Sequence, residues 1–470
     1  MRELVLAFTL VALGLTPFGL LYGYSVLVLP IQSILTPNDP YALKQSHAVW
    51  ALSGSLLASG AVLYFGAAMI RRDAKGTLVK SGLTSGIGLM LQGVAMDLAK
   101  HHRAAAIVIY YVGQLLFGTA CGLSTLVALI AALAWFGKLY PDWPGLGSGV
   151  FGPVLAMETS VFAWTFYAFN DKLGIGDLCR GCREGRVDIF FYVAAAVTFA
   201  TQFAAICLWE LPEPAATVRE DRERAVPRIS LSKAEVARTW TFWGYFWVYF
   251  VTLLPGFGLK LMASPVVYFT YGFSDAASTA FTCLYLAAYG LGRFFTPVLS
   301  RERFDRARRI YQYYSLISAV FLLVSPATIN GLPSDRWPAP LPFCCMVVAQ
   351  GFLLGGIKGL MPGVLRHLWC WMAEDPQYAH YDPLPAFNLV LGMNNLALCL
   401  AAAIGPGTAW VAYVGSPDVS QADLDSGRAT GKDFEYWYYA AGVVQLIAAG
   451  VLVFPNMVPR FEPPVAKVPL

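Results

Sequence analysis

Residues 212–238 read PEPAATVREDRERAVPRISLSKAEVAR and form the one long polar stretch in an otherwise apolar chain of 470 residues. Their charges and prolines indicate a linker. Six apolar stretches lie on each side of it, each long enough to cross about 30 Å of hydrocarbon. We therefore predict an all-α membrane protein of twelve helices, with six-helix halves at 1–211 and 239–470 joined by the linker at 212–238. The predicted spans are about 5–30, 47–70, 78–97, 104–134, 146–169, 187–209, 240–271, 274–299, 309–330, 339–369, 387–414 and 435–454.

The composition excludes an ordinary soluble protein. Hydrophobic residues make up 57% of the chain and aromatic residues 14%, whereas charged residues make up only 13%. A mean hydropathy of +0.56 over the whole length means that apolar segments dominate throughout, so a lipid bilayer is the predicted surrounding. The net charge of +4 is small for this length and points to no nucleic-acid partner.

The distribution of Lys and Arg predicts the orientation. Connections on the side of the linker carry about twice as many of these cations as connections on the other side, which places both termini in the cytoplasm. The apolar run at 5–30 is too long for a signal peptide, and no small-residue cleavage site ends it, so we predict a retained first helix. The expected location is the cell membrane.

The two halves resemble each other in their connections. GAAMIRRDAKG at 66–76 corresponds to TPVLSRERFDRARR at 296–309, and the Trp-rich WFGKLYPDWPG at 135–145 to WCWMAEDPQYAHYDPLP at 369–385. Repeated halves with a binding site between them near the bilayer midplane are a design of secondary transporters. The sequence therefore indicates two pseudo-symmetric halves.

Three cations remain inside the predicted spans: Lys260 in PGFGLKLMASP, Arg293 in YGLGRFFTP and Lys358 in GGIKGLMPG. A cation at this depth costs at least about 2.5 to 3.5 kcal/mol, so each is expected to face the interior and meet an anion. Glu158 is the only acidic residue well inside a span, and one carboxylate cannot neutralise three cations. The remaining positive charge predicts an anionic substrate at the midplane.

The strength of this argument differs among the charged residues. Lys260 and Lys358 could instead extend their long side chains to the interface, and that alternative stays open. Arg293 is the stronger candidate, because Gly290 and Gly292 thin its helix and let a ligand approach. Glu158 is a candidate for proton coupling, because burial favours the protonated form of a carboxyl group.

Several motifs resemble those of the major facilitator superfamily, and within it the oxalate/formate antiporter and monocarboxylate porter group. The first span carries Tyr22-Gly23-Tyr24-Ser25-Val26 with Pro30 after it, similar to the group's Tyr-x-aromatic-Ser-Val pattern before a proline. The fourth span ends in Trp135-Phe136, followed by Gly145-Leu146 and Gly149, similar to its Trp-Phe-Pro turn and Gly-Leu-x-x-Gly. The eighth span, Gly290-Leu291-Gly292-Arg293-Phe294-Phe295, resembles the segment whose arginine holds the substrate carboxylate.

This resemblance implies roles for particular residues. Arg293 would be the carboxylate ligand, as a guanidinium fork fits a carboxylate, and Tyr22 would be an aromatic wall of the same cavity. Oxalate exchangers of the group have a lysine in the eleventh span, where GMNNLALC offers only Asn394 or Asn395. The second positive charge would then come from Lys260 or Lys358. If neither lysine supplies it, a monocarboxylate is favoured over a dicarboxylate as the substrate.

The connection between the second and third spans departs from the superfamily's Gly-x-x-x-Asp-Arg-x-Gly-x-Arg. Gly66 and Arg71 match, but Ile70 replaces the acid and Asp73 the glycine. In the second half Arg301 stands where the corresponding Asp would be. That acid helps to close the inner gate in the family, so the resemblance makes Arg71 part of the gate, with Asp73 and Asp305 as candidate substitutes for the acid.

No motif of an enzyme is present, so we expect no catalytic residues, no cofactor and no metal. Cys179 and Cys182 form a lone CxxC, and a metal site would need further ligands, so a disulfide or free thiols account for it better. The predicted function is secondary transport of a small organic anion, by uniport, exchange or proton coupling. Two alternatives stay open: a porter for another solute such as an amino acid, and a non-transporting receptor or assembly factor.

Overall fold

The structure of this chain is a computed structural model. It describes residues 1–36, 47–65, 73–140, 146–172, 187–210, 229–230, 232–271, 273–300, 304–330, 340–370, 381–382, 384–414 and 435–453.

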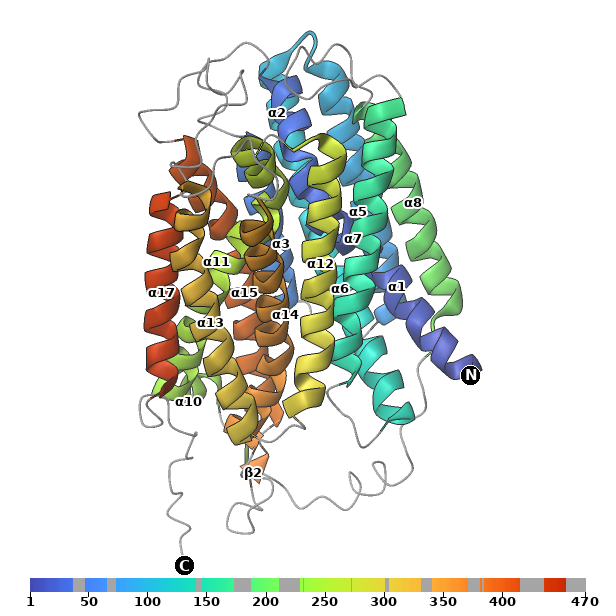
Figure 1. The fold of residues 1–470 in the computed structure, drawn as a ribbon. Coiled ribbons are helices and arrows are strands. Elements are labelled where there is room, and N and C mark those ends of the chain that lie inside the picture. The colour runs from blue at the N-terminus through green and yellow to red at the C-terminus, as the bar shows by residue number, and fades with distance from the viewer. Residues whose placement is uncertain are drawn as a thin grey trace, which may run out of the picture.

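Long helices that run side by side make up the described part of the chain (Figure 1). The first group consists of α1 (Arg2–Tyr22), η1 (Gly23–Val26), α2 (Val28–Leu35), α3 (His47–Phe65), α5 (Ala74–Leu98), α6 (Arg103–Leu139), α7 (Leu146–Lys172) and α8 (Val187–Leu208). The second consists of α10 (Lys233–Ala237), α11 (Trp240–Tyr271), α12 (Asp275–Ser300), α13 (Phe304–Asn330), α14 (Pro340–Cys370), α15 (Leu384–Val414) and α17 (Glu435–Val453).

Each of the twelve predicted spans contains a long helix, which confirms the predicted fold class within the described ranges. The first span differs from a single continuous helix, because the 3₁₀ turn η1 separates α1 from α2. Seven helices in the described residues are both long and apolar enough to cross a membrane, which supports a multi-pass membrane protein. Those stretches are Arg2–Val26, Arg103–Leu139, Val187–Leu208, Trp240–Lys260, Arg306–Thr328, Pro340–Leu365 and Leu389–Ala409.

The two groups of helices meet along two helix pairs, α7 with α12 and α3 with α15. Small residues bring the second pair together: Gly60 of α3 packs against Cys399 of α15, and Ser53 Oγ donates a hydrogen bond of 2.5 Å to the carbonyl oxygen of Ala403. Small residues allow such close packing in lipid, where the hydrophobic effect does not drive helices together. The turn η1 also contacts both α11 and α12, so the break in the first span lies at the boundary between the groups.

A buried polar network fixes the break in the first span. Tyr24 of η1 shares a hydrogen bond of 2.6 Å with the hydroxyl of Tyr110 and donates one of 2.9 Å to Gln92 Oε1. Gln114 Nε2 donates to Gln92 Oε1 at 3.0 Å, and Ser55 Oγ donates to Gln114 Oε1 at 2.5 Å. The network therefore ties η1 to α3, α5 and α6.

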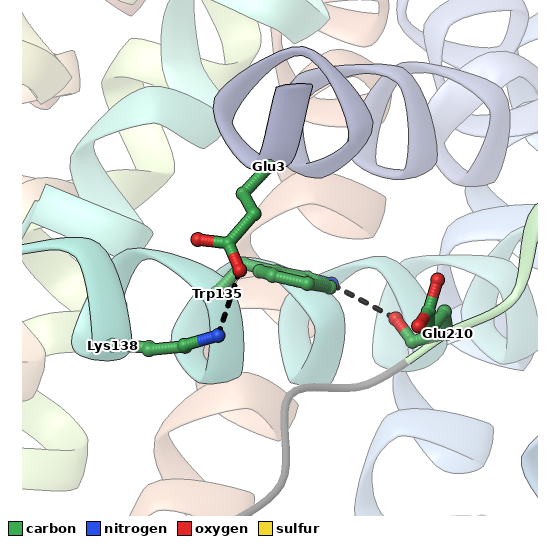
Figure 2. Close-up of polar contacts among 4 residues, drawn as sticks. All are labelled: Glu3, Trp135, Lys138 and Glu210. Carbon is green, nitrogen blue, oxygen red and sulfur yellow. Dashed lines mark hydrogen bonds and ion pairs between the residues drawn. The ribbon is translucent and has the colours of Figure 1, made fainter. Parts of the chain in front are cut away.

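Contacts at one end of the bundle join the end of α6 to the start of α1 and to Glu210, which follows α8 (Figure 2). Lys138 Nζ lies 2.8 Å from Glu3 Oε1, and Trp135 Nε1 donates a hydrogen bond of 2.9 Å to the carbonyl oxygen of Glu210. Both charged side chains are about half exposed, so their ion pair contributes little to stability. The buried Trp135 of the predicted Trp-Phe motif is the firmer anchor.

The start of α1 and the short helix α10 lie at the same end of the bundle (Figure 1). Before α10, Ile229 and Ser230 of strand β1 (Ile229–Ser230) pair in parallel with strand β2 (Tyr381–Asp382), which precedes α15. Residues 212–228 and 231 of the predicted linker lie outside the described residues. The boundaries at 211 and 239 therefore stay predictions, as do both termini's cytoplasmic location and the cell membrane.

Candidate functional site

The first span breaks where its aromatic residues meet the second half. Helix α1 ends at Tyr22, and its ring lies 6.2 Å from the ring of Phe257 of α11, measured between centroids. Both side chains are almost completely buried. Tyr22, predicted as an aromatic wall, therefore lies at the interface between the halves.

Lys260 of α11 places its ammonium group between two aromatic faces. Its Nζ lies 3.4 Å from the centroid of the Tyr22 ring and 3.8 Å from that of the Tyr289 ring of α12. The Phe257 ring is farther, at 5.7 Å. The side chain is 0% exposed, and its Nζ has no hydrogen-bond partner in the described residues. This burial argues against the alternative that Lys260 extends to the membrane–water interface.

Lys358 of α14 reaches the same aromatic cluster from a third helix. Its Nζ lies 5.7 Å from the Tyr22 centroid, 5.8 Å from that of Tyr289 and 5.9 Å from that of Phe257. The side chain is buried, so Lys358 also faces the interior. Two of the three predicted cations thus point at one set of rings.

Arg293 lies where α12 is held between α7 and α14. A Cβ at Gly152 of α7 would be 2.7 Å from the Arg293 Cβ, and a Cβ at Gly355 of α14 would be 3.0 Å from its backbone nitrogen. Only glycine permits both approaches. The guanidinium carbon lies 5.0 Å from the centroid of Phe151, and neither Nε nor Nη1 has a hydrogen-bond partner among the described residues. Arg293 is thus buried with unused donors.

The three buried cations bring positive charge into the interior without paired carboxylates in the described residues. Lys138 and Glu3 form an ion pair at the end of the bundle, and none of the three buried cations is paired with a carboxylate of the described residues. Glu158 of α7 is placed elsewhere: a Cβ at Gly19 of α1 would lie 2.8 Å from its Cβ and 3.0 Å from its Oε2. Within the described residues that Oε2 has no hydrogen-bond partner. The expected internal counter-ion therefore does not form a pair with a cation.

The remaining predicted residues are less closely tied to this cluster. Asn394 of α15 is buried and its Nδ2 donates to the carbonyl oxygen of Val390 at 3.0 Å, while its Oδ1 has no partner in the described residues. Asn395 is half-buried on the same helix. No contact between either amide and the three cations is found in the described part. Their binding roles stay predictions.

The predicted gate falls mostly outside the described residues. Gly66, Ile70, Arg71 and Arg301 lie there, as do Cys179 and Cys182. Asp73 is described and is the N-cap of α5, where its Oδ1 accepts a hydrogen bond of 2.8 Å from the Gly76 nitrogen. Asp305 lies in the first turn of α13. The gating role of Arg71, Asp73 and Asp305 stays a prediction.

Three aromatic residues that lie beside the buried cations were absent from the sequence prediction: Phe151, Phe257 and Tyr289. Tyr289 precedes Arg293 by four residues and Phe257 precedes Lys260 by three, and both spacings put side chains on one face of a helix. That spacing could have indicated them. Phe151 reaches Arg293 from the other half, and no local pattern reports such a contact.

Comparisons with known proteins find matches to the fold of this chain but none to its sequence. No protein-family model matches the chain, and no curated protein matches its sequence.

Solved structures do match the fold. They include the xylose transporter XylE from E. coli in a partially occluded inward-open conformation, with a TM-score of 0.61 at 12% identity over 98% of both chains. A D-xylose-proton symporter matches with a TM-score of 0.62 at 14% identity, over 97% of this chain and 98% of that one. XylE bound to 6-bromo-6-deoxy-D-glucose, a proton:xylose symporter of the major facilitator superfamily, matches at 0.61 and 13% identity over 96% and 95%. The chain therefore has the major facilitator fold.

Proposed function

We propose that this chain is a secondary transporter of small organic anions, which bind between its two halves and cross by alternating access. The observation that carries the proposal is that Lys260, Arg293 and Lys358 are all buried without a carboxylate partner in the described residues, with both lysines beside the same aromatic rings. Burying an unpaired cation is unfavourable, and a bound anion relieves that cost. The site is therefore most stable when an anion occupies it.

A carboxylate is the proposed anionic group. Arg293 has two buried nitrogens without partners among the described residues, and a guanidinium donates charge-assisted hydrogen bonds to carboxylate oxygens with good geometry. Lys260 and Lys358 supply further positive potential from two other helices. The aromatic rings of Tyr22 and Phe257 lie beside these lysines and would contact the bound anion.

The resemblance to the oxalate/formate antiporter and monocarboxylate porter group narrows the proposal to a monocarboxylate or an oxalate-like or formate-like anion. Because Lys260 and Lys358 both lie beside the ring of Tyr289, one turn before Arg293 on α12, the lysine missing from the eleventh span has candidate replacements. Uniport, exchange and proton coupling are all compatible with the site, and Glu158 is the proposed proton carrier in the last case. We propose both termini in the cytoplasm and the cell membrane as the location.

The solved neighbours act on xylose, two of them named as proton symporters, but at 12–14% identity they establish the fold alone. A porter for another solute, such as a sugar or an amino acid, would use the same fold. A non-transporting receptor or assembly factor is the alternative of a different class.

Counterflow into proteoliposomes separates these candidates. Vesicles containing the purified full chain are loaded with unlabelled solute and mixed with labelled formate, lactate, pyruvate or oxalate, and in parallel with xylose and amino acids. We expect accumulation of at least one carboxylate, and none in protein-free vesicles. Accumulation of xylose or an amino acid alone would assign another porter function, and no accumulation of any solute would favour a receptor or assembly role.

A further inference from the structure

Lys260 forms its closest described contacts with one ring from each half of the molecule. Tyr22 belongs to α1 of the first half, whereas Tyr289 belongs to α12 of the second, and the Lys260 Nζ lies within 3.8 Å of both ring centroids. We call these two rings the aromatic cage. The cage makes Lys260 a bridge between the halves.

The cage stabilises the ammonium group only in part. Aromatic faces attract a desolvated cation, but they offer no hydrogen-bond acceptor, and the three donors of Lys260 have none in the described residues. A carboxylate would provide both a full opposite charge and acceptors. The cage and a bound anion therefore compete for the same ammonium group.

We propose that Tyr22 and Tyr289 are positioning residues, which hold Lys260 between the halves while the site is empty and release it to the bound anion. This inference rests on the proposed function for its second step. The first step concerns the empty protein alone. Release of Lys260 removes a contact between the halves, so substrate binding and the opening of the interface are linked.

The backbone beside Tyr22 suits this role. Tyr22 is the last residue of α1, and the 3₁₀ turn that follows contacts α11 and α12. A change in the position of the Tyr22 ring can therefore alter the angle between α1 and α2 without unfolding either helix. The hydrogen bonds of Tyr24 hold the other side of the turn to the first half.

Lys358 is a natural comparison for Lys260. Its Nζ lies 5.7 to 5.9 Å from three ring centroids of the same cluster, near the limit of about 6 Å for an effective cation–π contact. Lys358 therefore lies near the same rings as Lys260, but its ammonium group is not held closely between Tyr22 and Tyr289. Removing the Lys358 charge should leave the bridge intact.

The test measures distances between the halves in the empty, full-length protein by double electron–electron resonance in lipid nanodiscs. Spin labels replace exposed residues at both ends, Lys75 with Lys233 and His102 with Tyr436, in a cysteine-free background of unchanged thermal stability. Loss of the cage should let the halves separate. We therefore expect K260M, Y22L and Y289L each to raise about tenfold the ratio of molecules with longer distances between the halves to those with shorter distances. Y22F and Y289F keep the ring faces, so they should give the same ratio of populations as the unmodified protein.

Two further variants separate the cage from general packing. Tyr285, one turn before Tyr289, is equally buried and bonds to the Gly256 carbonyl oxygen at 3.0 Å, so Y285L is a matched control that should leave the ratio unchanged. K358M should shift the ratio less than K260M does, because the Lys358 Nζ lies farther from the rings. In the K260M background, Y22L should add a smaller shift than it causes alone, because only the weaker contacts of Tyr22 with Phe257 and Lys358 are then left to lose.

The proposal is overturned if K260M leaves the distances unchanged, or if Y22L acts as strongly without Lys260 as with it. Adding a transported anion to the unmodified protein should reproduce the K260M distribution, and an unchanged distribution would refute the release step. Failure of the proposed function has a different signature. The protein would then transport no carboxylate, while the distances in the empty variants would still respond to loss of the cage.

Discussion

Gly152 of α7 and Arg293 of α12 touch across the boundary between the halves, so closely that a Cβ at position 152 would lie 2.7 Å from the Arg293 Cβ. The same Cβ would lie 2.9 Å from the carbonyl oxygen of Gly290. Both neighbours are fixed to the helix backbone and cannot rotate away. The position of the Arg293 side chain therefore depends on the absence of a side chain on the facing helix.

Gly152→Ala should separate α7 from α12 and displace Arg293. Overpacking of this kind costs about 1 to 3 kcal/mol, so we expect a lower thermal unfolding temperature and reduced counterflow. Gly137→Ala is the matched control, because nothing lies within 4 Å of a Cβ there. That change should be neutral or stabilising, since alanine favours a helix over glycine. Equal unfolding temperatures for the two variants would contradict the close packing.

Arg293→Gln should reduce carboxylate counterflow at least about tenfold, because charge-assisted hydrogen bonds contribute about 1.5 to 3 kcal/mol each. Arg293→Lys keeps the charge but loses the planar fork, so we expect partial activity with a raised KM. The exposed Arg103, at the start of α6, provides the control Arg103→Gln, which should transport normally. Unchanged transport of every carboxylate by both Arg293 variants would disprove the assignment.

Much of the fold could be predicted from the sequence because lipid constrains it strongly. A backbone in hydrocarbon must satisfy its own hydrogen bonds, so apolar runs of sufficient length become helices. The predicted stretches 240–271 and 187–209 agree with α11 and α8 almost to the residue. The break at Gly23–Val26 was missed, because the hydropathy of the first span continues through it.

The site was predictable only in its charges. Lys260, Arg293 and Lys358 stand out because cations are rare in apolar spans, and the structure buries all three. Their partners were not predictable, since aromatic residues are common throughout this chain. The position of Glu158 beside Gly19 depends on how α7 packs against α1, which no local pattern contains.

Glu158→Gln tests proton coupling. The carboxyl group is packed against α1, its buried Oε2 has no hydrogen-bond partner in the described residues, and glutamine keeps its shape while removing the titratable proton. If Glu158 carries the coupled proton, uptake driven by a pH gradient should be lost, while counterflow at equal pH persists. Glu3→Gln, at the surface, should affect neither. Gradient-driven uptake that survives in Glu158→Gln would exclude the coupling role.

Asp73 has a structural role that can be separated from a gating role. As the N-cap of α5 it accepts a hydrogen bond from Gly76, and its loss in Asp73→Ala should destabilise the helix by about 1 kcal/mol. Asp73→Asn keeps the cap but removes the charge. If Asp73 only caps the helix, Asp73→Asn should transport like the unmodified protein. Slower transport by this variant, at unchanged thermal stability, would support the gating prediction instead.

Tyr24→Phe should destabilise the protein more than Tyr289→Phe, although both remove one buried hydroxyl. The Tyr24 hydroxyl bonds to Gln92 and Tyr110, so its removal leaves buried polar groups short of partners at a cost of about 1 to 3 kcal/mol. The Tyr289 hydroxyl has no hydrogen-bond partner in the described residues, so its removal should cost little. Thermal unfolding of the two variants in the same detergent measures the difference. Equal losses would mean that the network around Tyr24 does not hold the break in the first span.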